Sequence, residues 1–209
     1  LGLTPNAVTL IGFALMLAAL GLFWDGHLGW GLLAAWPMTF LDTVDGKLAR
    51  VTLTSSKLGD VLDHGLDLVH PPVWYIAWGM GTGGPGLAWV LGMIVLGYLG
   101  GRSAELIFEI RISKSGIFCW RPFDSWFRLI TARRNPNLII LTLAIIMGQA
   151  YLGLIGVAIW TVFTTLVLLL RVYKAFECKK EYGFVTPWLA EIEKFQEHNP
   201  VAVKLFSKS

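Results

Sequence analysis

Four aspartates between residues 42 and 67 are the side chains in this 209-residue chain best placed to do chemistry. Asp42 and Asp45 are three residues apart, and Asp63 and Asp67 are four apart. On a helix, residues with these spacings share one face, so each pair would present its carboxylates together. Two neighbouring helices joined by the short segment 52–57 would bring all four carboxylates into one pocket.

Carboxylates gathered at the edge of a membrane repel one another unless cations neutralise them. Mg²⁺ and Mn²⁺ prefer oxygen ligands in octahedral geometry, which aspartates supply. Four acids are enough for two ions roughly 3.5–4 Å apart. Gly46, Ala49 and Gly59 leave room for a ligand on the same helix faces. Arg50 adds a planar, permanently charged group that suits phosphate. The pattern therefore predicts a site for two Mg²⁺ or Mn²⁺ ions beside a phosphorylated ligand.

The composition indicates that these acids belong to a membrane protein. Of the 209 residues, 55% are hydrophobic and 15% are charged, whereas soluble proteins carry about 25% charged residues. Residues 7–24 contain no Asp, Glu, Lys or Arg, and neither do residues 26–41. Each stretch approaches the ~20 residues that cross a bilayer core. We expect a transmembrane helix in each, the second continuing through the acidic motif to about Val51. Because the chain begins with Leu1 rather than Met, we also expect residues to precede it.

Two longer uncharged stretches each have room for two spans. Residues 68–101 would form a helix of about 50 Å if continuous, and residues 135–170 a similar one, against a bilayer core of about 30 Å. Glycines and a proline between residues 81 and 86, and glycines between residues 148 and 153, supply the turns. These divisions bring the predicted number of transmembrane helices to six.

The basic residues indicate the orientation. Six spans place the loops near residues 25–30, 81–86 and 148–153 on one side, and these loops hold none of the 17 Lys and Arg residues. The positive-inside rule makes the opposite face, where the aspartates lie, cytoplasmic. We therefore predict an all-α fold: a polytopic membrane helical bundle of six transmembrane helices, with interfacial helices on the cytoplasmic side.

Two cytoplasmic segments are predicted to lie along the membrane surface. One is a short helix that Asp124 would cap, with Trp126 and Phe127 on its apolar side. The other is the tail, in which four apolar residues recur at helical spacing: Trp188, Leu189, Ile192 and Phe195. We take residues 1–175 as the transmembrane domain and residues 176–209 as a cytoplasmic amphipathic tail.

The stretch from Asp42 to Asp67 resembles the signature of the CDP-alcohol phosphotransferase family. That signature reads DxxDGxxAR, eight residues, then GxxxDxxxD, and the chain matches every fixed position. Asn6, which follows Thr4-Pro5, and Thr9 also resemble the opening of the family. Beyond residue 70 the resemblance is confined to the number of spans and the basic loops.

The resemblance implies a metal-dependent transferase of phospholipid synthesis. A substituted phosphate would pass from a CDP-alcohol donor to the hydroxyl of a lipid or small polar alcohol, with release of CMP. Asp67 is implied to be the catalytic base and to touch a metal as well. The remaining implied ligands of metal and donor are Asp42, Asp45, Asp63, Asn6, Thr9, Gly46, Ala49, Arg50 and Gly59. The family also implies a homodimer among membrane lipids, and no nucleic-acid partner.

A second group of candidates is basic. A site for a phosphorylated acceptor could be formed by Arg102, Arg128, Arg133, Arg134 and Arg171. The alternative for most of these residues is contact with anionic lipid head groups. For Arg102 the alternative is a structural ion pair with Glu105, three residues later on the same helix.

Other functions and other substrates stay open at this point. An intramembrane cation transporter would also use buried acids, but such sites tend to lie at the midplane of repeated halves, and no repeat is evident. An inactive family member acting as a scaffold is a third possibility. Among the enzymes, the sequence from Asp63 to Asp67 resembles the amino-alcohol phosphotransferases, whereas six spans are typical of members that use CDP-diacylglycerol and a small polar alcohol.

Overall fold

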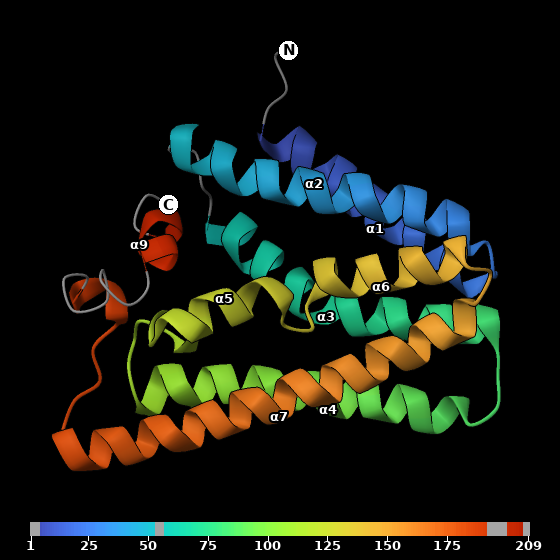
Figure 1. Cartoon of the computed structure of the whole chain (residues 1–209). Helices are drawn as coiled ribbons and strands as arrows, with labels where there is room; N and C mark the ends of the chain where they lie inside the picture. Colours follow the sequence, from blue (N-terminus) through green and yellow to red (C-terminus); the bar gives the residue numbers. More distant parts are fainter. Residues whose placement is uncertain (1–4, 53–56, 192–199, 207–209) are drawn as a thin grey trace. The chain divides into compact units, whose positions relative to one another are not determined.

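The computed structural model describes the backbone of residues 5–52, 57–191 and 200–206, and the side chains of residues 8–42, 68–191 and 201–206. All regular structure in these ranges is helical (Figure 1). The elements are α1 (Pro5–Trp24), α2 (Leu28–Thr52), α3 (Lys57–Thr82), α4 (Leu87–Arg111), η1 (Ile117–Cys119), α5 (Pro122–Ile130), α6 (Arg134–Ile146), α7 (Ala150–Tyr182), η2 (Trp188–Glu191) and α9 (Pro200–Phe206).

The chain divides into two compact units. Unit 1 comprises residues 1–94 and 137–158, and unit 2 comprises residues 95–136 and 159–209. The divisions fall within α4 and within α7, so each of these helices contributes one part to each unit.

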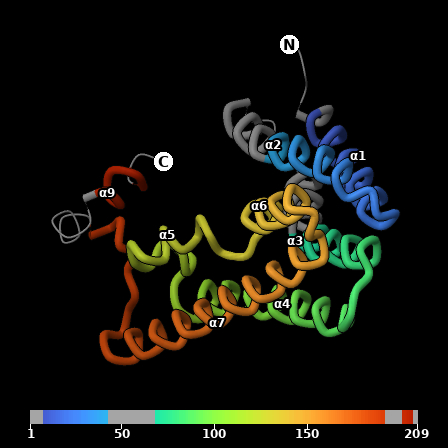
Figure 2. Tube along the Cα trace, turned by 45° about the vertical axis from the view of Figure 1, so that its right-hand side comes forward, coloured from blue at the N-terminus to red at the C-terminus, as the bar shows by residue number. Residues whose placement is uncertain are grey.

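Large aromatic side chains fill the core of unit 1. Phe23 on α1 packs against Trp74 and Trp78 on α3, with ring centroids 5.9 and 5.2 Å apart. Trp74 donates its indole N–H to the carbonyl of Met16, and Trp78 donates to the carbonyl of Ala150, both at 3.1 Å. Each buried indole thus has its hydrogen bond as well as its apolar contacts, as buried tryptophans require. In Figure 2, α1 and α2 run side by side in this unit.

Glycines make the turns that the sequence predicts. Between α3 and α4, Gly83, Gly84 and Gly86 have φ values of 62°, 139° and 71°, which L side chains rarely adopt. Gly148, with φ of 67°, occupies the turn between α6 and α7. Both predicted divisions of the long uncharged stretches are therefore confirmed as breaks between helices.

Unit 2 is built on a close contact between α4 and α7. A Cβ atom at Gly97 would lie 3.0 Å from the methyl carbon of Thr161, and one at Gly101 would lie 3.2 Å from Oγ1 of Thr165. Thr165 donates its hydroxyl to the carbonyl of Gly97 at 2.7 Å. Small residues four apart that let two helix backbones approach, joined by a threonine hydrogen bond, are typical of packing inside membranes.

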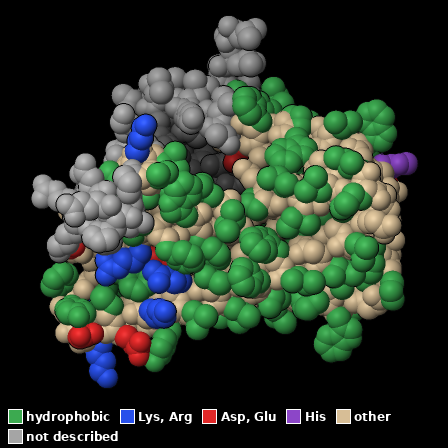
Figure 3. Space-filling model, viewed as in Figure 1, with side chains coloured by type: hydrophobic (Ala, Val, Ile, Leu, Met, Phe, Trp, Pro, Cys, Tyr) green, Lys and Arg blue, Asp and Glu red, His purple; other side chains and the backbone are tan. Residues whose placement is uncertain are grey.

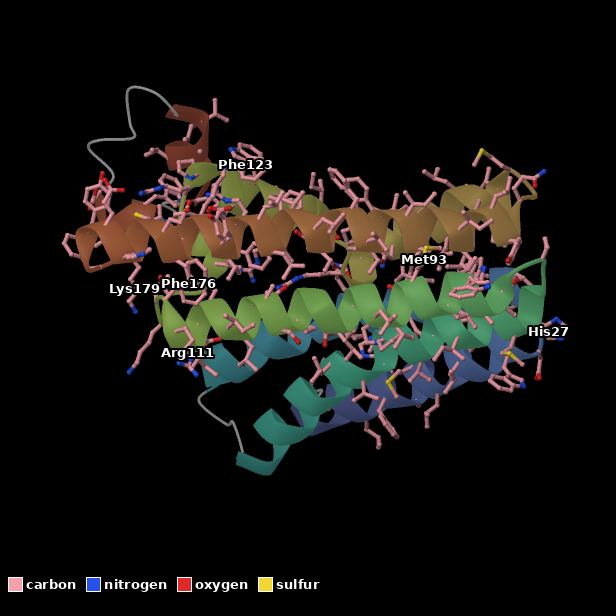
Figure 4. The ribbon with its side chains drawn as sticks, turned by 90° about the horizontal axis from the view of Figure 1, so that it is seen from below. His27, Met93, Arg111, Phe123, Phe176 and Lys179 are labelled. Atoms are coloured by element: carbon pink, nitrogen blue, oxygen red, sulfur yellow. The ribbon has the colours of Figure 1, made fainter. Side chains whose placement is uncertain are left out.

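At the other end of the same helix pair, a lysine of α7 binds backbone carbonyls at the C-terminus of α4. Lys179 on α7 donates from Nζ to the carbonyl of Arg111 at 2.6 Å and lies near the carbonyl of Ile112 at 3.3 Å. Figure 4 shows Lys179 beside Arg111, where α4 ends. A cation at a helix C-terminus satisfies carbonyls that have no partner within the helix and interacts favourably with the helix dipole.

Two helices in the described ranges, α4 and α7, are long and apolar enough to cross a membrane. The pair α5 and α6, bent by 43° at the break between them, gives a third candidate if counted as one span. Both long helices expose large apolar side chains, including Trp89 at 83% and Leu96 at 72% on α4, as lipid-facing helices do. Helices occupy all six predicted positions, but α6 alone, with 13 residues, is only about 20 Å long. The six-span topology stays a prediction.

The predicted surface helices differ from the structure in detail. The N-cap of α5 is Arg121, without a side-chain cap hydrogen bond, so the expectation that Asp124 caps this helix is wrong. The carboxylate of Asp124 is instead buried in an ion pair with Arg171. In the tail, η2 is a 3-10 turn that begins at Trp188, and the predicted positions Ile192 and Phe195 lie outside the described residues. The expected domain boundary at residue 175 lies inside α7.

Candidate functional site

The acidic motif lies on two helices of unit 1. α2 carries Asp42, Asp45, Gly46, Ala49 and Arg50, and its helical backbone continues through all of them to Thr52. α3 begins at Lys57 and carries Gly59, Asp63 and Asp67. Continuous helix through both halves of the motif is what places residues three and four apart on a common face. Both helices pack against α1 within the unit.

Of the four aspartates, only Asp42 belongs to the described side chains, where it is half-buried. Thr9 on α1 is exposed. The predicted positions whose side chains lie outside the described residues are Asn6, Asp45, Gly46, Ala49, Arg50, Gly59, Asp63 and Asp67. Within the described side chains there is no group of three His, Cys, Asp or Glu residues that could hold a metal ion. The metal site at the four aspartates stays a prediction.

Polar side chains are buried next to both ends of the motif. Thr39, three residues before Asp42, is 5% exposed, and His70, three residues after Asp67, is 4% exposed. The His70 ring packs edge-on against Trp74, with centroids 5.0 Å apart. This contact agrees with a packing role for His70.

A further buried polar contact in unit 1 has little signal in the sequence. Asn137 on α6 is 1% exposed and donates from Nδ2 to the hydroxyl of Tyr75 on α3 at 3.0 Å. Among the described residues, its Oδ1 has no hydrogen-bond partner. The only signal in the sequence is a polar amide at the start of a long apolar run. The contact joins α6 to the helix that carries half of the acidic motif.

The predicted basic candidates all lie in unit 2, and two of them share one carboxylate. Glu105 on α4 accepts at Oε2 from Arg102 at 3.1 Å and from Arg133 at 2.8 Å. The structural ion pair considered for Arg102 is thus present. The guanidinium of Arg133 also lies over the Phe118 ring, 4.9 Å from its centroid. Arg102, Arg133 and Glu105 together form a cluster with one excess positive charge.

A small pocket lies beside this cluster. Its volume of about 10 Å³ is close to the room that one water molecule needs. Four threonines are among the residues that line it: Thr131, Thr161, Thr164 and Thr165. Arg102 and Glu105 also line the pocket. A cavity this small can hold a solvent molecule between polar groups, but it has no room for a sugar or lipid head group.

The break between α5 and α6 is held by side chains of α7. Trp160 donates from Nε1 to the carbonyl of Ile130 at 2.8 Å, and the backbone N–H of Ala132 donates to Oγ1 of Thr164 at 3.3 Å. Backbone groups that leave a helix in an apolar environment need such partners. These two contacts hold the break against α7, next to Arg133, whose guanidinium binds Glu105.

Arg171, near the cytoplasmic end predicted for α7, is bound within its own unit. Its Nε and Nη2 atoms donate to the two carboxylate oxygens of Asp124, each at 2.6 Å. The guanidinium also lies over the rings of Trp120 and Phe123, at 4.3 and 5.5 Å from their centroids. The side chains of Arg171 and Asp124 are 18% and 3% exposed. This bidentate pair occupies two of the five guanidinium N–H donors, and with them one edge that a phosphate would otherwise use.

Burial raises the pKa of the Asp124 carboxyl above its ordinary value, while the hydrogen bonds and charge of Arg171 act in the opposite direction. α5 lies outside the two helices long enough to cross a membrane.

In Figure 3 most charged side chains on the visible face lie over α5 and the C-terminal end of α7. Arg128 and Arg134 complete the predicted group. Arg128 lies over the Phe118 ring at 5.9 Å, and Nε of Arg134 donates to Asn135 at 3.3 Å.

Comparison with known proteins identifies one family and several similar chains. The family model described as CDP-alcohol phosphatidyltransferase matches residues 2–189. A phosphatidylinositol phosphate synthase of Mycobacteroides abscessus is 37% identical over 112 residues, which are 49% of this chain and 51% of that protein. Choline/ethanolaminephosphotransferase 2 of Arabidopsis thaliana is 38% identical over 91 residues, 38% of this chain and 23% of that protein. No solved structure matches the chain.

An archaetidylinositol phosphate synthase of Pyrococcus horikoshii is 41% identical over 68 residues, which are 32% of this chain and 36% of that protein. The matched segments thus span about half or less of the length of each of these relatives.

Proposed function

The chain belongs to the CDP-alcohol phosphatidyltransferase family, and we propose that it transfers a substituted phosphate from a CDP-alcohol to an acceptor hydroxyl, releasing CMP. The observation that carries this proposal is the acidic motif, which is complete at every fixed position from Asp42 to Asp67 and lies within the matched residues 2–189. The helical backbone of α2 and α3 through the motif supports it.

We assign the metal site to Asp42, Asp45, Asp63 and Asp67. Their carboxylates suit Mg²⁺ or Mn²⁺, because both ions prefer oxygen donors, and four acids on two helices provide enough ligands for two ions. Asp42, the one aspartate of the four whose side chain is described, is half-buried on α2. When bound, the ions would stabilise negative charge on the pyrophosphate of the donor.

Residues of the same two helices would perform the other steps. Asp67 would accept the proton of the attacking hydroxyl, since a carboxylate beside a bound phosphate is within reach of the incoming nucleophile. Arg50 would hold a phosphate oxygen through its planar fork of donors. Gly46, Ala49 and Gly59 would let the donor approach the helix backbone. Asn6 and Thr9 would contact its nucleotide.

We propose that the protein is a multi-pass membrane protein with six transmembrane helices and its acidic motif at the cytoplasmic face. The complete absence of Lys and Arg from the three predicted outer loops supports this orientation. α5, which exposes Phe123, Trp126 and Ile130 at 53%, 40% and 51%, would lie at the membrane surface, as would the tail beyond residue 175. We expect a homodimer, as the family resemblance implies.

The relatives point to two classes of substrate. One class contains the synthases of phosphatidylinositol phosphate and archaetidylinositol phosphate, and the other contains the choline/ethanolaminephosphotransferase. The five arginines of unit 2 are the candidate acceptor site for a phosphorylated alcohol. A choline or ethanolamine donor would instead require a lipid acceptor without phosphate.

The test is a phosphotransfer assay on the purified chain in lipid nanodiscs. Donors would be CDP-diacylglycerol, CDP-choline and CDP-ethanolamine, each with a panel of lipid and polar acceptors, with CMP release and product mass measured together. We expect CMP release with one donor class, its loss in excess EDTA and its return with Mg²⁺ or Mn²⁺. Asp67→Asn should lower turnover by roughly 10²–10⁴-fold with little change in donor binding. Asp25→Asn, in a predicted outer loop, is the matched control.

Each arm of this assay can fail separately. Full activity in excess EDTA would refute the metal site. Undiminished turnover by Asp67→Asn would refute the assignment of Asp67 as the base. Loss of donor binding in that variant would show that Asp67 acts only as a ligand. No CMP release by the wild-type chain from any donor in the presence of metal would overturn the proposed reaction.

A further inference from the structure

The C-terminal residues of unit 2 bury one tryptophan completely. Trp188, the first residue of η2, is 0% exposed. Its Nε1 donates to Oγ of Ser125 on α5 at 2.9 Å, and that hydroxyl donates onward to the carbonyl of Phe118 at 2.8 Å. A large side chain with all of its surface removed from water and its polar atom paired contributes strongly to the position of its neighbours.

A second contact joins the end of the chain to the same helix. Phe206 on α9 lies edge-on against Trp126 of α5 and against Trp188, with ring centroids 5.4 and 6.4 Å apart. Ala202, also on α9, is 2% exposed. Figure 1 shows η2 and α9 beside α5. The matched family region ends at residue 189, so α9 lies beyond it.

α5 depends on such contacts because it is short. It has 9 residues, and isolated helices of fewer than ~12–15 residues are marginal in water. Its buried residues are Pro122, Asp124, Ser125 and Phe127, of which the last three are 2%, 7% and 5% exposed. Asp124 binds Arg171, and Ser125 binds Trp188 from the next position along the helix. The ion pair and the tryptophan contact therefore stabilise adjacent buried positions of α5.

We propose that η2 and α9 form a C-terminal strap that holds α5 in place through Trp188 and thereby keeps Arg171 covered by Asp124. When the strap is in place, α5 presents the Asp124 carboxylate to both donor atoms of the guanidinium. When it is released, α5 loosens, the pair separates and Arg171 becomes accessible to anions from solution. The strap thus sets the accessibility of one cationic side chain. This inference concerns the fold of unit 2 and does not rest on the proposed activity.

The test uses the full chain in lipid nanodiscs and two readouts that need no substrate. The first is hydrogen exchange of the backbone amides of α5. The second is the rate at which phenylglyoxal modifies Arg171, measured by peptide mass spectrometry. We expect Trp188→Ala to accelerate both by roughly 10- to 100-fold, because local opening limits each reaction. Trp89→Ala, which removes an indole that is 83% exposed on α4, is the matched control and should change neither.

Two further variants keep the proposal testable if Trp188→Ala misfolds. Trp188→Phe retains an aromatic ring but loses the N–H donor, and Phe206→Ala removes only the contact of α9. Each should give a smaller acceleration in the same two readouts, while amide exchange in α1 stays at the wild-type rate. Unchanged exchange in α5 for all three variants would overturn the proposed strap. Faster exchange without any increase in Arg171 modification would overturn its link to the ion pair.

Discussion

Replacing Arg171 by methionine is expected to destabilise the protein by about 3–5 kcal/mol at neutral pH, because it leaves the Asp124 carboxylate buried without a counter-charge. Methionine is close to arginine in length and keeps an apolar contact with the ring of Trp120, so the change isolates the charge. The carboxylate is 3% exposed, and both of its oxygens accept from Arg171 at 2.6 Å. Two hydrogen bonds to charged groups contribute about 1.5–3 kcal/mol each, which gives a similar range.

The loss of stability should depend on pH in a defined direction. Burial already raises the pKa of Asp124, and Arg171 is the main group that opposes this rise, with a smaller contribution from Arg121. Without Arg171 the pKa increases further, so the folded state binds a proton more tightly than the unfolded state. Stability of the variant therefore falls as pH rises from the unfolded-state pKa through the folded-state pKa, and the difference from wild type is smallest in acid.

The assay is denaturant-induced unfolding of the protein in detergent micelles, followed by tryptophan fluorescence at several pH values. A second variant, Asp124→Asn combined with Arg171→Met, removes both charges and should recover most of the lost stability, because the orphaned charge is gone. Lys174→Met, an exposed position on the same helix, is the control and should lie within about 0.5 kcal/mol of wild type.

Two outcomes would refute this reasoning. If the double variant is as unstable as the sum of Arg171→Met and Asp124→Asn measured singly, the two side chains do not interact. If Arg171→Met loses the same stability at every pH, the Asp124 carboxylate is not the group left without a partner.

Two other substitutions test the contacts of α4. Gly101→Val places methyl groups against Thr165 and should lower the free energy of unfolding by about 1–3 kcal/mol in the same assay. Gly92→Val is the control and should cost far less, because a Cβ there meets nothing within 4 Å. Equal losses would contradict the close helix contact. Glu105→Gln removes the charge that two arginines share and should lower the free energy of unfolding by about 1–2 kcal/mol, because the paired side chains are 20–30% exposed. Glu109→Gln, at an exposed position, is the control. A loss no larger than that of the control would show that the cluster adds no stability.

The helices and turns could be predicted from the sequence because their causes are local. An uncharged run, a cluster of glycines and an excess of basic residues on one side are all visible within short windows. The turns at Gly83–Gly86 and at Gly148 follow from conformations that only glycine adopts readily. The aspartate spacing is equally local, which is why the motif predicts a shared helix face from the spacing alone.

The partners of buried charges could not be predicted in the same way. Asp124 follows a proline at the start of a short helix, where an acidic residue near the N-terminus normally favours a capping or dipole role. In the fold, Arg171, 47 residues away along the chain, binds that carboxylate instead. The helical spacing of the tail predicts Trp188 at the membrane surface, yet tertiary packing buries it entirely. Neither contact has a signal in the neighbouring sequence.

The arginines show most clearly why residue type alone does not define an anion site. A guanidinium is available to a phosphate only if its donors and its charge are not already engaged. Arg171 directs two donors at Asp124, and Arg102 and Arg133 share Glu105. The three arginines and their two carboxylate partners together carry a net charge of about +1, whereas the arginines alone would carry +3. An anion that binds here must either displace a carboxylate or bind to a site whose positive charge is already partly neutralised. The fixed positions of the aspartate motif hold four acids and one arginine, Arg50, so the pattern carries excess negative charge that a cation has to neutralise. The proposed chemistry therefore rests on the acids of α2 and α3.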